Sequence, residues 1–363
     1  MKTNNKFISS VWKFDQDRTE ADYYIHNYFR WLGKLPYELV RKLIEMYSQK
    51  DDTILANFAG SGTVLLEANF SARNSIGVDI NPLSNLICQV KMNATIPNYE
   101  PFVKRLENKM KSRPKHDYIT PSMKKWFDIK SANSINNILE EIKAIKNKRY
   151  RNFYLLALAN IIKDVSKVDS RCVNHLIIDK NKAQVDIFKK YLDSLVNLKE
   201  MLIKIKQRKT HSKAKIIIGD AQNLGFISKD SIDLIISHPP YFGQIMYYNI
   251  YSLADDIIGS DYDNIKSNDL STNNLNKYIN GMKKVFDEMY RVLKPNKYMC
   301  VIVGDSRKDG QIIPISTQFI DYATKIGFKL TDIFIWILGG KAGMNVARRG
   351  NFIDHNYILV FKK

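Results

Sequence analysis

Apolar positions follow two different periods along this chain. Tyr37–Tyr47 carries apolar side chains on one helical face, which predicts an amphipathic helix, and Pro36 suits the first turn of that helix. Helices are also expected at 64–69, 275–292 and 314–326. Short apolar runs favour buried strands, and they fall at 53–56, 75–79, 215–218, 232–236, 298–303, 332–337 and 357–361.

The order of these elements indicates the fold class. A strand, a glycine-rich turn, a helix and a second strand follow one another over residues 53–79. That order begins an open parallel α/β sheet. We therefore expect an α/β fold, with polar loops at 260–274 and 341–351.

Residues 91–215 differ from the rest in both periodicity and charge. Helical patterns dominate there, at 135–145, 153–165 and 185–205. This segment holds about 29 Lys and Arg against about 12 Asp and Glu, a surplus of about 17, so the rest of the chain is close to neutral. The sequence therefore predicts three parts: an N-terminal segment with the first half of the α/β domain at 1–90, a basic helical insertion at 91–214, and the second half of the domain at 215–363.

The composition indicates a folded chain with a polyanionic partner. The 363 residues include 45% hydrophobic side chains, which is enough for a buried core. A net charge of +19 favours nucleic acid as the partner. The alternative is that the charge reflects a proteome rich in Lys, Asn and Ile.

Cysteines, histidines and apolar runs bear on metals, disulfides and membranes. The three cysteines are far apart, and neither they nor the six histidines have metal-ligand spacing. The N-terminus lacks the apolar region of a signal peptide, and no apolar run approaches the roughly 20 residues of a membrane span. We expect no disulfide, no metal, no membrane association and a cytoplasmic location.

A glycine-rich turn follows the strand at 53–56. Its glycines allow a ligand to approach the backbone closely, and the helix that follows offers unsatisfied N–H groups. Asp79 ends the next strand, where a carboxylate can accept hydrogen bonds from a ribose diol. The alternatives are a tight packing turn, and an Asp79 that caps the helix after Asn81. The turn is Asn57-Phe58-Ala59-Gly60-Ser61-Gly62-Thr63.

A second polar loop follows the strand at 232–236 directly. It is Ser237-His238-Pro239-Pro240-Tyr241. The two prolines remove two N–H donors and fix φ, so a rigid loop is expected at the ligand-binding edge of the sheet. Its carbonyls can accept hydrogen bonds from a planar amine, with Tyr241 or, second, Phe242 stacking on the ring; the alternative is an ordinary Pro-rich loop.

A third acidic position follows the strand at 215–218. Asp220 could accept a hydrogen bond from an adenine amino group, and Ala221 follows it. The alternative is that Asp220 caps the next helix.

Together these motifs resemble those of the S-adenosylmethionine-dependent DNA amino-methyltransferases, which methylate cytosine N4 or adenine N6. The glycine turn is similar to their cofactor loop, and 237–241 is similar to their catalytic loop. Segments 290–295 and 354–362 resemble the helix end and the final strand of that fold, and 26–44 resembles the segment that closes over the methionine end of the cofactor.

This resemblance implies a Rossmann-like class I methyltransferase sheet, mostly parallel with an antiparallel last strand, that carries a basic helical insertion. It implies S-adenosyl-L-methionine as the cofactor. The catalytic residues would be Ser237, His238, Pro239, Pro240 and Tyr241. The cofactor-binding residues would be His26, Asn57, Phe58, Ala59, Gly60, Gly62, Thr63, Asp79, Ile80, Asp220 and Ala221.

Two positions depart from the family pattern. Ala56-Asn57 stands where Asp-Pro is usual, and that acid helps to hold the amino end of the cofactor. His238 stands immediately before Pro-Pro. A protonated imidazole could not accept a hydrogen bond from the target amine, so His238 should act in its neutral form; alternatively only its backbone carbonyl acts.

The implied function is site-specific methylation of double-stranded DNA, with the target base flipped into the loop and a preference for cytosine N4. Adenine N6 methylation, RNA N-methylation and a non-catalytic nucleic-acid-binding role are the alternatives; a nicotinamide dehydrogenase would not need the His-Pro-Pro-Tyr loop. A cognate restriction endonuclease is a candidate partner. The predicted DNA contacts in the insertion are Lys124, Lys125, Lys148, Arg149 and Arg151.

Overall fold

The computed structural model describes residues 9–14, 21–169, 171, 176–260, 268–308, 311–338 and 355–363. The expected loop at 341–351 lies outside the described residues, as do residues 261–267 of the one at 260–274. Within the described part, an eight-stranded sheet has the order β1-β9-β10-β6-β5-β2-β3-β4. The strands are β1 (Ser10–Lys13), β2 (Thr53–Ala56), β3 (Asn74–Asp79), β4 (Ala214–Ile218), β5 (Ile232–Ser237), β6 (Leu293–Val303), β9 (Lys329–Ile337) and β10 (His355–Lys362).

The sheet is parallel except around its last strand. β10 is antiparallel to both β6 and β9, whereas β1, β2, β3, β4 and β5 pair in parallel with their neighbours. Every residue of β5 is buried, which is typical of a central strand covered on both faces. The mostly parallel, Rossmann-like sheet with an antiparallel final strand is therefore confirmed.

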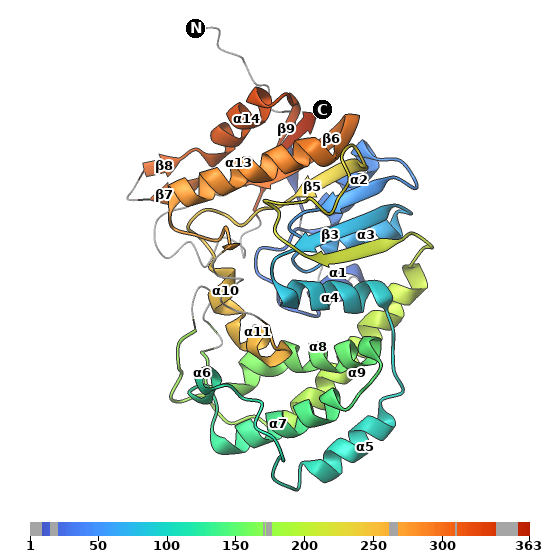
Figure 1. The fold of residues 1–363 in the computed structure, drawn as a ribbon, viewed down its shortest axis with the longest axis vertical. Helices are drawn as coiled ribbons and strands as arrows, with labels where there is room; N and C mark the ends of the chain where they lie inside the picture. The colour runs from blue at the N-terminus through green and yellow to red at the C-terminus, as the bar shows by residue number, and fades with distance from the viewer. Residues whose placement is uncertain are drawn as a thin grey trace.

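Helices cover both faces of the sheet (Figure 1). On one face, α13 (Leu275–Val292) and α14 (Ile315–Lys325) share a buried core with the sheet. On the other face lie α2 (Tyr37–Tyr47), α3 (Thr63–Phe70) and α4 (Pro82–Asn93), whose apolar side chains belong to a second core. The expected bounds of α2 and α13 agree with the structure.

The basic insertion forms a helical lobe below the sheet (Figure 1). Its described helices are α5 (Glu100–Lys109), α6 (Pro121–Lys124), α7 (Ile129–Lys143), α8 (Lys148–Val165) and α9 (Ile187–Arg208). α8 packs on α4, α7, α9 and α11 (Ser252–Ile258), and α1 (Ala21–Asn27) packs on α9. The lobe therefore has contacts with segments that precede it and follow it in the chain.

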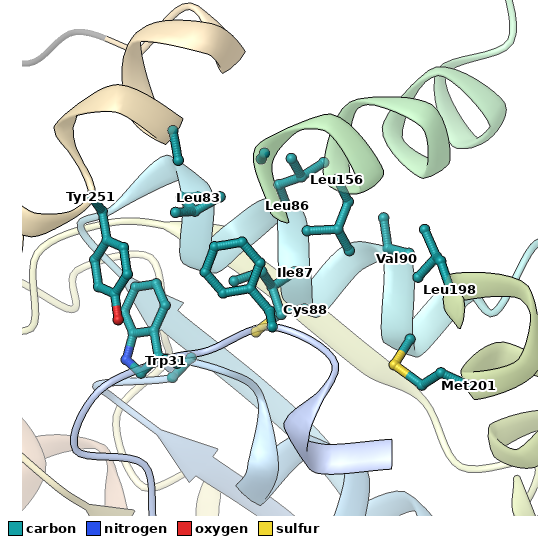
Figure 2. Packing of buried hydrophobic residues seen from close by; sticks show 14 of the residues in the cluster. Trp31, Leu83, Leu86, Ile87, Cys88, Val90, Leu156, Leu198, Met201 and Tyr251 are labelled. Carbon is teal, nitrogen blue, oxygen red and sulfur yellow. The ribbon is translucent and has the colours of Figure 1, made fainter. Parts of the chain in front are cut away.

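α4 joins the lobe to the sheet. Figure 2 shows Leu86 and Val90 of α4 beside Leu156 of α8 and beside Leu198 and Met201 of α9. Nine of the twelve residues of α4 are buried, so the helix has apolar contacts on nearly every side. This explains why α4 carries no clear amphipathic pattern and was not predicted.

Other elements were also absent from the predicted set. They are the edge strand β1, the helices α1, α5, α6, α10 (Tyr247–Ile250) and α11, and the hairpin β7–β8 (Ser306–Lys308 and Gln311–Ile313). These elements are short or partly exposed, so their local pattern is weak. Cys88 and Cys300 are buried free thiols.

Among the described residues, none of the helices has both the length and the apolar character needed to cross a bilayer. The same residues contain no group of three or more His, Cys, Asp and Glu side chains placed to hold a metal ion.

Candidate active site

Neighbouring strands end at one hollow of the molecule. β5, β2, β3 and β4 are adjacent in the sheet, and residues that follow them line a cavity of about 960 Å³, its open mouth included. This is the edge at which open α/β sheets bind ligands. The predicted site residues that line the cavity are Asn57, Phe58, Ala59, Gly60, Thr63, Asp79, Ile80, Asp220, Ala221, His238 and Pro240.

The shape of the glycine turn requires glycine. Gly60 has φ 50° and Gly62 has φ 78°, both in the left-handed region. A Cβ on Gly60 would lie 2.9 Å from Trp31 Nε1, and one on Gly62 would lie 3.0 Å from Cys88 Sγ. Gly62 caps the N-terminus of α3 and does not itself line the cavity. Gly60 therefore shapes the cavity wall, while Gly62 allows the turn to pack on α4.

Asp79 connects the glycine turn to the end of β3. Its Oδ2 accepts a hydrogen bond from Gly60 N at 2.7 Å, and its Oδ1 accepts one from Asn81 N at 3.0 Å. Burial raises the pKa of Asp79, and these backbone bonds oppose that rise. The N-cap of α4 is Asn81, whose side chain accepts a bond from Leu83 N, so Asp79 is not the helix cap.

Asp220 occupies the corresponding place after β4. Its Oδ1 accepts a hydrogen bond from Gln222 N at 2.9 Å, which closes a local turn. Asp220 and Ala221 both line the cavity. Turns and no helix follow Asp220 in residues 221–231, so the alternative that it caps the next helix is not supported.

Two buried polar side chains at this edge have atoms without a hydrogen-bond partner among the described residues. Asn57 lines the cavity with only 1% of its surface exposed, and neither its Oδ1 nor its Nδ2 has a hydrogen-bond partner. Ser237, at the end of β5, is fully buried, and its Oγ is also unpartnered. Buried polar atoms are normally paired, so an unpaired amide beside a cavity indicates a ligand-binding position.

The His-Pro-Pro-Tyr loop presents His238 and Pro240 to the cavity. His238 Nε2 lies 3.0 Å from the Tyr241 hydroxyl, and the two rings are edge to face at 5.2 Å. Tyr241 does not line the cavity, and Pro239 is buried. The Pro240 carbonyl accepts a hydrogen bond from the Tyr278 hydroxyl at 3.0 Å.

Phe242, the second aromatic candidate for stacking on the base, is packed in the core. Phe242 is buried at 3% exposure and packs on Tyr278 with the ring centroids 5.7 Å apart. Its carbonyl accepts a hydrogen bond from Ser306 Oγ. Phe242 is a core residue, so the prediction that it could stack on a target base is not supported by its position.

We expect His238 to stay neutral well below pH 7, because burial lowers its pKa to about 4. The unfolded chain, with an ordinary histidine pKa of about 6.5, then binds more protons between the two values. The free energy of unfolding is therefore unaffected by His238 above about pH 6.5, and it falls as the pH drops from 6.5 toward 4. In an NMR titration of protein with labelled histidine rings, the His238 signal should show no inflection near pH 6.5. The His238→Gln variant identifies that signal.

His26 does not line the cavity. It is 2% exposed, its Nε2 is 2.9 Å from Glu67 Oε1, and its ring stacks on Tyr37 at 5.3 Å. Arg41 completes this buried group through its Nε, 2.8 Å from Glu67 Oε2. His26 therefore anchors the N-terminal segment, and its predicted contact with the cofactor is not supported by the geometry.

Sequence reasoning did not identify several residues that line the cavity. Trp31 is one, and its ring stacks on Tyr251 at 4.5 Å (Figure 2) and on Tyr247 at 6.0 Å. The Tyr247 hydroxyl donates to the Leu32 carbonyl at 3.2 Å. These contacts join two segments about 215 residues apart. The resemblance of 26–44 to the segment that closes over the cofactor was the signal that pointed to the region of Trp31, without naming the residue. The others are Gly33, Lys34, Leu35, Ser61, Val64, Asn81, Ile236, Tyr248, Asn268, Asp269 and Leu270.

The two predicted DNA-contact strips lie at opposite ends of α8. Lys124 and Lys125 are exposed beside Trp126, whose carbonyl accepts from Lys167 N just past the C-terminal end of α8. Figure 1 shows α6 on the same side of the molecule as α10 and α11. Lys124 also pairs with Asp117 at 2.9 Å. This strip therefore lies on the side of the lobe where α10 and α11 are in the view of Figure 1.

The second strip, Lys148, Arg149 and Arg151, is in the first turn of α8. Asn152, the next residue, bonds Gln89 in the C-terminal half of α4 at 2.9 Å. The N-terminal end of α4 is at the cavity, and Gln89 is seven residues past Pro82, which is about 10 Å along the helix at 1.5 Å per residue. The second strip is therefore remote from the cavity.

A family model described as DNA methylase, of the N6/N4 methyltransferase type, matches residues 1–85 and 232–363. The chain belongs to this DNA methylase family. The membership confirms the predicted resemblance, and S-adenosyl-L-methionine is the cofactor. The match leaves out residues 86–231, which contain the helical lobe and β4.

Curated relatives are type II methyltransferases. M.BsoBI of Geobacillus stearothermophilus is 26% identical over 281 residues, covering 67% of this chain and 54% of that protein. M.MjaI of Methanocaldococcus jannaschii is 27% identical over 169 residues, covering 41% of this chain and 55% of that protein. The chain thus spans about half the length of these relatives.

Among solved structures, the chain matches a SAM-dependent methyltransferase of Methanosarcina mazei. That protein is 12% identical to this chain, the match covers 88% of this chain and 96% of that protein, and the TM-score is 0.39.

The cavity residues fit this cofactor. Asp79 offers carboxylate oxygens at the strand end where a ribose diol is bound in α/β sheets. The glycine turn allows close approach of the backbone, and Asn57 offers a buried amide with no protein partner. The donor and acceptor set therefore suits a ligand with a ribose and a polar tail.

Proposed function

We propose that this chain transfers a methyl group from S-adenosyl-L-methionine to an exocyclic base amine in double-stranded DNA, with cytosine N4 as the preferred target. The observation that carries this proposal is that one cavity is lined both by the glycine turn with Asp79 and by His238 with Pro240. A cofactor loop and an amine-binding loop that share one cavity can bring the two reactants together.

The catalytic problem is the weak nucleophilicity of the target amine. Its lone pair is delocalised into the ring of the base, so acceptors that hold both N–H groups draw it toward a tetrahedral geometry. When bound, the cofactor supplies an electrophilic sulfonium methyl group, so positioning accounts for much of the remaining catalysis. A base in a duplex must leave the stack to reach such a pocket, which is why we propose base flipping.

His238 is the side chain best placed to accept from the amine. Its neutral imidazole has one N–H donor and one acceptor nitrogen. If Nε2 donates to the Tyr241 hydroxyl, Nδ1 becomes the acceptor. The His238 backbone carbonyl is the alternative acceptor. We further propose that Ser237, Pro239 and Tyr241 support this loop, with Tyr241 turning to stack on the base.

The deciding experiment is transfer of a tritiated methyl group to duplex DNA and, in parallel, to RNA. We expect label in DNA, and N4-methylcytosine after hydrolysis to nucleosides. N6-methyladenine would retain the reaction class and change the target, while label in RNA alone would reject the DNA assignment. Because the named relatives are type II methyltransferases, we also propose a cognate restriction endonuclease as the cellular partner.

We propose that the helical lobe binds the DNA backbone, and that Lys124 and Lys125 are among its contacts. Each lost phosphate contact should lower the slope of log K against log salt by roughly one unit, so the double alanine variant should lose about two. Fluorescence anisotropy over a salt series measures this. The matched control, Lys284→Ala with Lys325→Ala, removes the same charge from exposed positions on α13 and α14 and should not change the slope.

The second strip is tested independently. Replacing Lys148, Arg149 and Arg151 with alanine should lower the salt slope by about three and weaken all DNA sequences alike. Cofactor affinity should stay the same. A slope equal to that of the wild type would give this remote end of α8 a purely structural role.

A further inference from the structure

The cavity residues follow the order of the strands along the sheet edge. Asp79 and Asp220 follow β3 and β4, whereas Asn57 follows β2, beside β5 and its His238. Neighbouring strands are about 4.8 Å apart, so Asn57 lies about 10 Å along the edge from the Asp220 end. If the ribose is held at Asp79 and the adenine at Asp220, the amino-acid end of the cofactor would lie over β2 and β5, close to Asn57.

At this end the chain lacks the expected acid. Ala56 stands in the position where the resemblance calls for an aspartate, and Ala56 is 1% exposed. The neighbouring Asn57 offers a neutral amide whose donor and acceptor atoms are both without a protein partner. The end of the cavity that would carry a negative charge is therefore neutral at these two positions.

Two lysines place positive charge beside the cavity and the glycine turn. Lys34 lines the cavity, and its ammonium donates to the His26 carbonyl at 3.1 Å and to Asn27 Oδ1. An ammonium has three protons, so these two bonds leave one for a ligand. Lys91, on α4 behind the glycine turn, is 1% exposed and donates to the Ser61 carbonyl at 2.9 Å.

The protein partners of these ammonium groups are uncharged oxygens. Burial, with a smaller contribution from Lys91, lowers the pKa of Lys34 to about 7, and burial lowers that of Lys91 to about 8. Two ammonium groups in this position favour an anionic ligand group, because a carboxylate would relieve their mutual repulsion and the cost of their burial.

We propose that this end of the cavity recognises the cofactor by its carboxylate, through Lys34, and that the Asn57 amide binds the amino-acid end in place of the usual acid. Lys91 is a positioning residue that supports the glycine turn. This inference rests on the proposed use of S-adenosyl-L-methionine at this site. It predicts that affinity depends on the carboxylate of the ligand more than on its amino group.

Isothermal titration calorimetry with three ligands tests the assignment. S-adenosylhomocysteine carries both groups, its decarboxylated analogue carries only the amine, and 5′-methylthioadenosine carries neither. The wild type should bind S-adenosylhomocysteine roughly 10- to 100-fold more tightly than the decarboxylated analogue. Lys34→Met should reduce this difference to about twofold while leaving 5′-methylthioadenosine unchanged, and Lys34→Arg should retain the preference.

Two further variants separate a loss of binding at the amino-acid end of the ligand from a loss of binding through its ribose. Asn57→Ala should weaken S-adenosylhomocysteine and leave 5′-methylthioadenosine unchanged. Asp79→Asn should weaken all three ligands by similar factors, because each contains the ribose. A carboxylate preference that persists in Lys34→Met, or equal losses for all ligands in Lys34→Met and Asn57→Ala, would overturn the inference while the proposed function stands. A wild type that binds none of the three would overturn both.

Discussion

Tyr241→Ala is expected to lower the single-turnover rate of methyl transfer by roughly 100-fold or more, with cofactor affinity nearly unchanged. The Tyr241 ring lies edge-on to His238, and its hydroxyl is 3.0 Å from His238 Nε2. Removal of the ring would free the imidazole and take away the proposed stacking surface, and misplacement of a catalytic group by about 1 Å can cost about 100-fold. Rapid-quench assays with tritiated cofactor measure the rate.

A conservative variant separates the ring from the hydroxyl. Tyr241→Phe keeps the ring and removes one hydrogen bond, so we expect a loss of about tenfold or less. His238→Ala, measured in parallel, shows whether the side chain or only the backbone acts. A Tyr241→Ala protein with the full single-turnover rate would remove Tyr241 from the mechanism.

Asp79→Ala is expected to weaken cofactor binding by roughly 1.5–3 kcal/mol, the usual range for a hydrogen bond to a charged group. The carboxylate is expected to hold the ribose, and it also accepts from Gly60 N at 2.7 Å, so its loss should loosen the glycine turn as well. Calorimetric titration measures the change directly. The control is Asp321→Ala, an exposed acid on α14 far along the chain from the site. Unchanged affinity in Asp79→Ala would end the assignment of this residue.

Seven strands of the eight-stranded sheet could be predicted from the local pattern of the sequence. Apolar runs predicted β2 and placed β5 within one residue of its observed end, because a strand buried on both faces must be apolar at nearly every position. The glycine turn and the Pro-Pro loop were also readable, since their backbone demands restrict the residue types. Both then lie at strand ends, as the fold class requires.

Residues that reach the site only through tertiary packing could not be predicted from local pattern. Trp31 lines the cavity only because Tyr247 and Tyr251, more than 200 positions later, stack against it. Lys34 and Lys91 are ordinary lysines in the sequence, and only the fold places them beside the glycine turn. Their burial depends on contacts between distant segments, which leave no periodic signal.

The sequence by itself determined the α/β class, the basic insertion and the two loops, because each follows from local rules of burial, charge or backbone conformation. Only the tertiary structure decided which of those residues meet. It placed the His26 ring against Glu67 and outside the lining of the cavity, turned Tyr241 toward His238, and separated the two basic strips to opposite ends of α8. These outcomes depend on how helices and strands pack, and packing is set by long-range contacts that no short stretch of the chain contains.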